Sequence, residues 1–232
     1  MKKHIPNFLT LLNLFCGLIA LQYASIGYFK GTLFWIFLGI VFDFFDGFVA
    51  RMLKVSSPLG LQLDSLADMV TSGVVPGQVM FLLISNVTPS YGGFYELIPF
   101  SGFLITLASA YRLAKFNIDT RQTSSFIGLP TPANALFIVG LGVGQMDDNL
   151  TFFYLPLWGL LSITLLSCYL LNSEIELFAL KFKDFSLKNN AIKYLFLVIS
   201  IILLLIFKVL GIPLIIVAYI LLSVFMKITK KL

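Results

Sequence analysis

The segment FWIFLGIVFDFFDGFVARMLKVSSPLGLQLDSLADMV, residues 34–70, places four aspartates in sequence apolar enough to cross a membrane. They are Asp43, Asp46, Asp64 and Asp68, four of the eleven acidic residues of the chain. A carboxylate inside a bilayer is costly, and such residues face a bundle interior or a water-filled cavity, where they serve function. The segment therefore indicates both the class of fold and the position of a site.

The composition of the whole chain favours an integral membrane protein. Of its 232 residues, 59% are hydrophobic and 12% are charged, about half the charged fraction of an average soluble domain. An apolar run of about 20 residues is long enough to cross a bilayer as a helix. We therefore expect an all-α, polytopic membrane helix bundle, with eight spans near 6–28, 32–52, 62–86, 97–116, 130–146, 151–172, 191–208 and 211–227. Pro76, Pro130 and Pro132 interrupt or border the third and fifth of these runs.

The basic residues predict the orientation of the chain. Cytoplasmic connections of membrane proteins are enriched in Lys and Arg. Fourteen of the sixteen basic residues flank the termini or the even-numbered connections, and the other two are Lys30 and Lys208. We therefore expect a multi-pass protein of the inner, cytoplasmic membrane, with both termini and the open end of the four-aspartate segment in the cytoplasm. The net charge of +5 reflects this asymmetry and does not point to nucleic acid.

Helical spacing gives the first two aspartates a common face. Asp43, Asp46, Gly47 and Ala50 stand at positions i, i+3, i+4 and i+7, which lie along one side of a helix. Because Gly47 and Ala50 have almost no side chain, a ligand can approach the backbone beside the carboxylates. Arg51 follows at the cytoplasmic end, where a guanidinium can meet an anionic group such as a phosphate.

The second pair of aspartates repeats this pattern on the next helix. Ser57 is a predicted N-cap and Pro58 the first helical residue, because these residue types favour those positions. Gly60, Asp64 and Asp68 then stand at i, i+4 and i+8, on one face. A tight hairpin between the two helices would bring all four carboxylates together.

Four neighbouring carboxylates need a counter-charge, because repulsion and desolvation disfavour their ionised forms. Oxygen ligands without Cys or His nearby suit hard ions, and four aspartates can bridge two ions of Mg²⁺ or Mn²⁺. Such a pair of ions beside a small-residue groove and an arginine is typical of displacement at phosphorus. The alternatives are scattered acids neutralised by Lys or Arg, or the proton path of a transporter.

Read as a pattern, the segment is Asp43-x₂-Asp46-Gly47-x₂-Ala50-Arg51-x₈-Gly60-x₃-Asp64-x₃-Asp68, which resembles the full signature of the CDP-alcohol phosphatidyltransferases. The resemblance implies an integral membrane enzyme, usually a homodimer, that moves a phosphatidyl group from a CDP-linked lipid to a hydroxyl acceptor and releases CMP. It also implies a core of six spanning helices. The expected division is a catalytic core at 1–172, a cytoplasmic connection at 173–190 and a C-terminal helix pair at 191–232.

The same resemblance implies roles for the residues of the signature. Asp43, Asp46 and Asp64 would be metal ligands, and Asp68 would be both a ligand and the general base. Contacts with the CDP-diacylglycerol donor would come from Asn7, Thr10, Gly47, Ala50, Arg51, Ser57 and Gly60. Asn7 and Thr10 belong to the stretch PNFLT, and for them capping and helix–helix hydrogen bonding in the membrane is an equal alternative.

Three further stretches resemble the phosphatidylserine synthase branch of the family: LTLLNLFCG at 9–17, ASAYRLAKFN at 108–117 and FIGLPTPANA at 126–135. SLADMVTSGVVP at 65–76 is also similar, although Ser72 stands where that branch more often has Phe. The resemblance implies L-serine as the acceptor and phosphatidylserine as the product.

The acceptor site requires a cation, because serine carries a carboxylate. Arg112, Lys115 and Arg121 could bind that group. A glycerol 3-phosphate acceptor would require the same cations. Alternatively, Lys115 and Arg121 only reflect the general enrichment of Lys and Arg on the cytoplasmic side. Transfer to glycerol 3-phosphate or inositol therefore stays an alternative, as does a cation or proton-coupled transporter. The sequence shows no unwound spans in two related halves, which would be typical of such a transporter.

Overall fold

The computed structural model describes residues 4–55, 57–89, 91–119, 126–146, 153–178 and 187–229. These residues are almost entirely helical, which confirms the expected all-α membrane bundle. The α-helices are α1 (His4–Ser25), α2 (Phe29–Leu53), α3 (Pro58–Asp68), α4 (Val75–Val87), α5 (Leu104–Ile118), α6 (Thr131–Gln145), α7 (Leu157–Asn172), α8 (Leu187–Phe207) and α9 (Gly211–Ile228).

Shorter elements join several of these helices. A π-helical turn, Met69–Val74, lies between α3 and α4, and 3₁₀-helical segments at Gly93–Phe103 and Lys208–Leu210 precede α5 and α9. The strands β1 (Phe126–Ile127) and β2 (Glu176–Leu177) form a small antiparallel sheet that the sequence did not predict. β2 falls within the connection predicted at 173–190.

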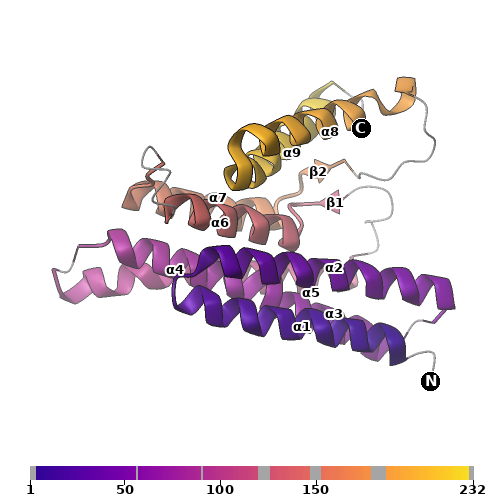
Figure 1. Ribbon diagram of the computed structural model, residues 1–232, viewed down its shortest axis with the longest axis horizontal. Coiled ribbons are helices and arrows are strands. Elements are labelled where there is room, and N and C mark those ends of the chain that lie inside the picture. The colour runs from indigo at the N-terminus through magenta and orange to yellow at the C-terminus, as the bar shows by residue number, and fades with distance from the viewer. Residues whose placement is uncertain are drawn as a thin grey trace.

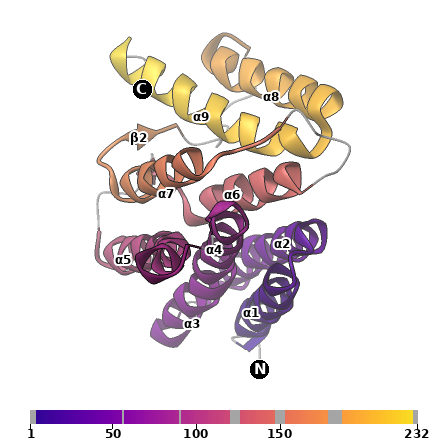
Figure 2. The same cartoon turned by 90° about the vertical axis from the view of Figure 1, so that its left-hand side faces the viewer.

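The helices lie in three tiers. Helices α1 to α5 form the first tier, α6 and α7 lie on it, and α8 and α9 form the third (Figure 1). The end-on view shows the same order, with the C-terminal pair farthest from α1 (Figure 2). Helix α6 packs on α2 and α4, α7 packs on α5, and α9 packs on α6.

Five helical stretches of the described residues are long and apolar enough to cross a membrane. They are His4–Ser25, Phe29–Leu53, Pro58–Val87, Gly93–Ile118 and Asn190–Ile228. The last stretch contains both predicted C-terminal spans, which fold back on each other in Figure 1. The reversal lies at Lys208, which has the left-handed φ of 51° that turns require.

Two of the eight expected spans are shorter than predicted. Helices α6 and α7 contain 15 and 16 residues, or about 22–24 Å at 1.5 Å per residue, which is less than a hydrocarbon core of about 30 Å. The expected start of the second at 151 is wrong, because the helix begins at Leu157, directly after Pro156. A residue before proline is disfavoured in helical conformation, so the helix starts only there.

Small residues bring α1, α2 and the π-helical turn into close contact. A side chain at Gly17 would collide with Thr71, and a Cβ at Gly39 would lie 2.9 Å from Asn13 Oδ1. The Thr71 hydroxyl donates to the Asn13 carbonyl at 3.2 Å. Because membrane helices associate through such close packing and hydrogen bonds, these contacts fix where α1 stands relative to the aspartate-bearing helices.

The π-helical turn explains how the third span passes Pro76. Proline lacks an N–H group and clashes with the carbonyl four residues earlier, which is that of Ser72. The wider turn at Met69–Val74 lies directly before this proline, and helix α4 then continues with Pro76 in its first turn. The span therefore stays helical from Pro58 to Val87 and carries Asp64 and Asp68 toward the bundle interior.

Candidate active site

The hairpin between α2 and α3 positions the aspartates. Helix α2 ends at Leu53, and the left-handed φ of 53° at its C-cap, Lys54, turns the chain. The Ser57 hydroxyl then accepts a hydrogen bond from the Gly60 N–H at 3.0 Å, and Pro58 is the first residue of α3. This confirms the predicted N-cap, and the short connection sets the two acidic faces side by side.

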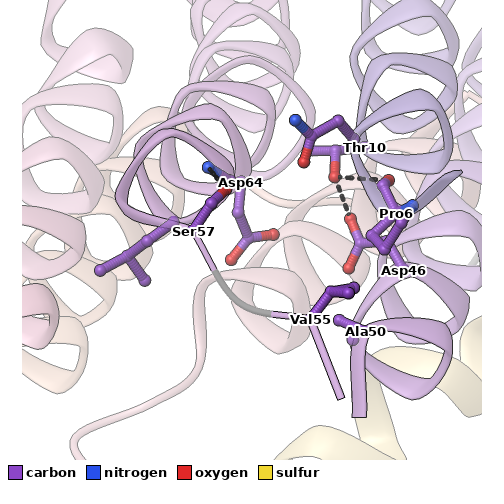
Figure 3. Close-up of a pocket in the computed structure, with 11 residues that line it drawn as sticks. Pro6, Thr10, Asp46, Ala50, Val55, Ser57 and Asp64 are labelled. Atoms are coloured by element: carbon purple, nitrogen blue, oxygen red, sulfur yellow. Dashed lines mark hydrogen bonds between the residues drawn. The ribbon is translucent and has the colours of Figure 1, made fainter. Parts of the chain in front are cut away.

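Three of the four carboxylates meet. Asp43, Asp46 and Asp64 each offer an oxygen within 4.8 Å of the others. Asp46 is buried, and the other two are partly buried. Figure 3 shows the Asp46 and Asp64 side chains reaching from different helices toward the same space.

Asp68 lies one helical turn beyond Asp64 and is not one of this group of three in the described part of the chain. Its Oδ1 accepts a hydrogen bond from Asn13 Nδ2 at 3.2 Å. Asn13 comes from α1, so the packing of that helix also orients Asp68. Its surroundings therefore differ from those of the other three aspartates.

A first cavity of about 230 Å³ opens beside the carboxylates. Six of the seven residues predicted to contact the nucleotide line it, namely Asn7, Thr10, Gly47, Ala50, Ser57 and Gly60. Pro6, Val55 and Leu61 also line it, and the sequence did not indicate them. The Thr10 hydroxyl lies within hydrogen-bond distance of Asp46 Oδ2 and of the Pro6 carbonyl, as Figure 3 shows.

Arg51, the seventh of these predicted contacts, does not line the cavity wall. Its side chain is exposed, and its Nη1 atom lies 3.3 Å from the position that a Cβ on Gly47 would occupy. The guanidinium therefore folds over the glycine, next to the cavity, where an anionic group of a bound ligand can reach it.

A second cavity of about 280 Å³ lies on the other side of Asp64. Asp43, Asp64 and Asp68 line it together with Arg112, whose side chain is only 7% exposed. The Arg112 Nη2 donates to the Gly128 carbonyl at 3.3 Å, and its Nε has no hydrogen-bond partner among the described residues. This cavity combines a buried cation with the carboxylate that stands apart.

The model of one protein family, CDP-alcohol phosphatidyltransferase, matches residues 3–155, about two thirds of the chain. The chain belongs to this family. All residues that line the two cavities lie within the matched range, whereas α8 and α9 lie beyond it.

Several similar proteins bear the name CDP-diacylglycerol–serine O-phosphatidyltransferase. The one from Bacillus subtilis is 35% identical over 141 residues, which cover 59% of this chain and 74% of the relative. The one from Methanocaldococcus jannaschii is 38% identical over 136 residues, 59% of each chain. The one from Saccharomyces cerevisiae is 32% identical over 169 residues, 64% of this chain and 58% of the relative. The matched region thus spans less than two thirds of the last two relatives.

Of the three cations predicted to bind the acceptor, Arg112 lines the second cavity. Lys115 forms an ion pair with Glu174, with Nζ and Oε1 2.9 Å apart, and does not line the second cavity. Arg121 lies outside the described residues. Of the two that the structure describes, Arg112 is the one that lines a cavity with the carboxylates of the family signature.

The second cavity also has polar residues to which sequence reasoning gave no role. Ser65, Asn117 and Thr131 line it, and Asn117 Nδ2 donates to Ser65 Oγ at 2.8 Å. Asn117 and Thr131 fall within the stretches 108–117 and 126–135, so the resemblance pointed to the right segments. These uncharged side chains were missed because only Lys and Arg were considered as residues that bind the acceptor.

The donor atoms at the cluster fit a hard divalent cation. Oxygen ligands from carboxylates are those that Mg²⁺ and Mn²⁺ prefer, and three of them converge here. No ion pair joins these three aspartates to Lys or Arg in the part of the chain that the structure describes. Carboxylates this close are costly to keep ionised, and a bound divalent cation would offset that cost.

Proposed function

We propose that the chain transfers the phosphatidyl group of CDP-diacylglycerol to the hydroxyl group of L-serine, giving phosphatidylserine and CMP. The observation that carries this proposal is that Asp64 lines both cavities. A donor in the first cavity and an acceptor in the second would meet at the acidic cluster. The names of the relatives favour serine over other acceptors.

The donor binds in the first cavity. Gly47, Ala50 and Gly60 leave space for the nucleotide between α2 and α3. Arg51 stands beside this space and binds a phosphate of the donor. Ser57, whose hydroxyl caps α3, also lines the cavity. Thr10 holds the Asp46 carboxylate through its hydroxyl.

The acidic cluster would hold two divalent ions, Mg²⁺ or Mn²⁺, with Asp43, Asp46, Asp64 and Asp68 as the ligands. Three of these carboxylates already converge, and Asp68 borders the same cavity as Asp43 and Asp64. When bound, such ions offset the charge of the diphosphate and favour the departure of the leaving group.

The acceptor binds in the second cavity. Arg112 binds the serine carboxylate, and Ser65, Asn117 and Thr131 provide oxygen atoms for its ammonium group. Asp68, held by Asn13, takes the proton from the serine hydroxyl. The serine oxygen then attacks the lipid-side phosphorus, and the bond from that phosphorus to CMP breaks. No covalent enzyme intermediate is required.

The orientation belongs to the same proposal. We infer that both termini and the acidic cluster face the cytoplasm, as the distribution of Lys and Arg predicts. The start of α1, the end of α2 and the end of α9 all lie in the right-hand half of Figure 1, which supports this arrangement. A homodimer and the division at residues 172 and 190 stay predictions.

The test is CMP release from CDP-diacylglycerol by purified protein with Mg²⁺ or Mn²⁺, in the presence of serine, glycerol 3-phosphate or inositol. We expect serine to stimulate release most, and a chelator to abolish it. Stimulation by glycerol 3-phosphate but not by serine would contradict the acceptor, since Arg112 suits a phosphate equally well. No release with any acceptor would favour the transporter.

A further inference from the structure

A short set of residues joins the C-terminal helix pair to the second cavity. We call residues 126–129 and 173–178 the clasp. Within it, β1 and β2 pair antiparallel, and the Gly128 N–H donates to the Ile175 carbonyl at 2.8 Å. The Leu129 N–H donates to the Leu170 carbonyl, also at 2.8 Å. Backbone hydrogen bonds therefore hold the two segments of the clasp to each other and to the end of α7.

Gly128 is the centre of the clasp. Its φ of +73° is a conformation that side chains disfavour, and a Cβ there would lie 2.6 Å from the Leu171 carbonyl oxygen. Its N–H donates to the Ile175 carbonyl of the other segment, and its own carbonyl accepts the hydrogen bond from Arg112. The position of the Arg112 guanidinium thus depends on where the clasp holds Gly128.

The other end of the clasp is held by α9. The Tyr219 hydroxyl donates to the Phe178 carbonyl at 2.9 Å, and the two rings pack edge to face with centroids 5.0 Å apart. Phe196 of α8 completes the cluster, 5.7 Å from Phe178 and 5.8 Å from Tyr219. All three side chains are buried. Phe178 directly follows β2, so α8 and α9 fix the strand that in turn fixes Gly128.

We propose that Tyr219 is a positioning residue, which holds Arg112 at the acceptor cavity through Phe178, the β1–β2 pair and Gly128. This inference rests on the proposed function. It gives the C-terminal pair, which lies beyond the range matched by the family, a part in binding the acceptor. None of the site residues predicted from the sequence lies on these two helices.

The variant that tests this is Tyr219→Phe, which removes one hydroxyl and keeps the ring. Loss of one hydrogen bond in this chain of contacts should raise the KM for serine about two- to tenfold. The KM for CDP-diacylglycerol should stay unchanged, because the first cavity does not contact the clasp. A general loss of folded protein would instead lower the maximal rate at unchanged KM for both substrates.

Ser223→Ala is the matched control. Ser223 is a buried hydroxyl residue on the same helix, and it donates to the Tyr219 carbonyl within α9 at 2.7 Å, away from the clasp. It should leave both KM values unchanged. In a double-mutant cycle, Tyr219→Phe should add little to the serine KM of Arg112→Lys, because both changes act on the same contact.

Hydrogen exchange gives a readout that does not depend on catalysis. The amides of Gly128 and Leu129 should exchange faster in Tyr219→Phe than in the parent and in Ser223→Ala. Unchanged exchange at 126–129, or an unchanged serine KM in an active parent, would overturn the inference. Faster exchange in a protein without serine-stimulated CMP release would confirm the clasp and contradict the proposed function.

Discussion

Asp68 differs from its three neighbours in what it contacts. It accepts a hydrogen bond from Asn13 and lies outside the group of three converging carboxylates. We expect Asp68→Asn to retain binding of CDP-diacylglycerol and to lower the maximal rate by about 100-fold or more, since loss of a general base has that magnitude. Donor binding and CMP release, measured on the same preparation, check this.

Two further variants calibrate that result. Asp43→Asn removes one of the converging carboxylates, so it should weaken donor and metal binding as well as the rate. Glu96→Gln changes an exposed acid that lines neither cavity, and it should behave as the parent does. Equal turnover by Asp68→Asn and the parent would remove Asp68 as the base.

A larger side chain at Gly47 tests whether the donor binds in the first cavity. It lines the first cavity, so a valine side chain would fill part of the space for the nucleotide. Because overpacking costs about 1–3 kcal/mol, Gly47→Val should raise the KM for CDP-diacylglycerol about tenfold and leave the KM for serine little changed. Gly159→Val, in α7 and outside both cavities, is the control. An equal effect of the two variants would contradict the assignment of this cavity to the donor.

At this scale the sequence predicted much of the site, because helical periodicity fixes which residues share a face. Helical spacing and a hairpin predicted that all four aspartates meet, and three of them do; Ser57 with Pro58 predicted the cap. It could not predict that Lys115 pairs with Glu174, because these residues are 59 positions apart and meet only through tertiary packing.

Among the elements, the contact between α1 and the π-helical turn determines how the acidic hairpin sits. A side chain on Gly17 would collide with Thr71. We expect Gly17→Val to lower the free energy of unfolding by about 1–3 kcal/mol, the usual cost of overpacking. Thermal unfolding in detergent measures this as a lower midpoint.

Gly159→Val is the control for this change as well. A Cβ at Gly159 meets nothing closer than Pro156 at 3.4 Å, which is ordinary van der Waals distance. Its unfolding midpoint should stay close to that of the parent. A Gly17→Val protein as stable as this control would show that α1 and the turn do not pack as described.

The sequence located the helices better than it located their ends or their partners. Eight apolar runs became helices, but 130–146 and 151–172 gave helices of only 15 and 16 residues. Hydropathy records apolar character and not the backbone geometry that ends a helix, such as the restriction that Pro156 imposes. The clasp was missed for another reason: β1 and β2 have two residues each, too few for any alternation of side chains to be visible.

For the molecule as a whole, the orientation in the membrane can be tested by labelling. Tyr91, between α4 and the Gly93–Phe103 segment, is 76% exposed, and Thr229 follows the end of α9 and is exposed. In a background with Cys16→Ala and Cys168→Ala, we expect a membrane-impermeant maleimide to label Tyr91→Cys on intact cells. It should label Thr229→Cys only in inverted vesicles. The reverse pattern would place the acidic cluster outside the cytoplasm.

The two cavities share one wall at Asp64 but are otherwise lined by different residues. The two substrates can therefore bind at the same time. Both are present when the phosphatidyl group is transferred. Steady-state rates should accordingly follow a ternary-complex scheme, in which double-reciprocal plots at several serine concentrations intersect. Parallel lines, or a burst of CMP before serine is added, would instead indicate a covalent phosphatidyl-enzyme intermediate.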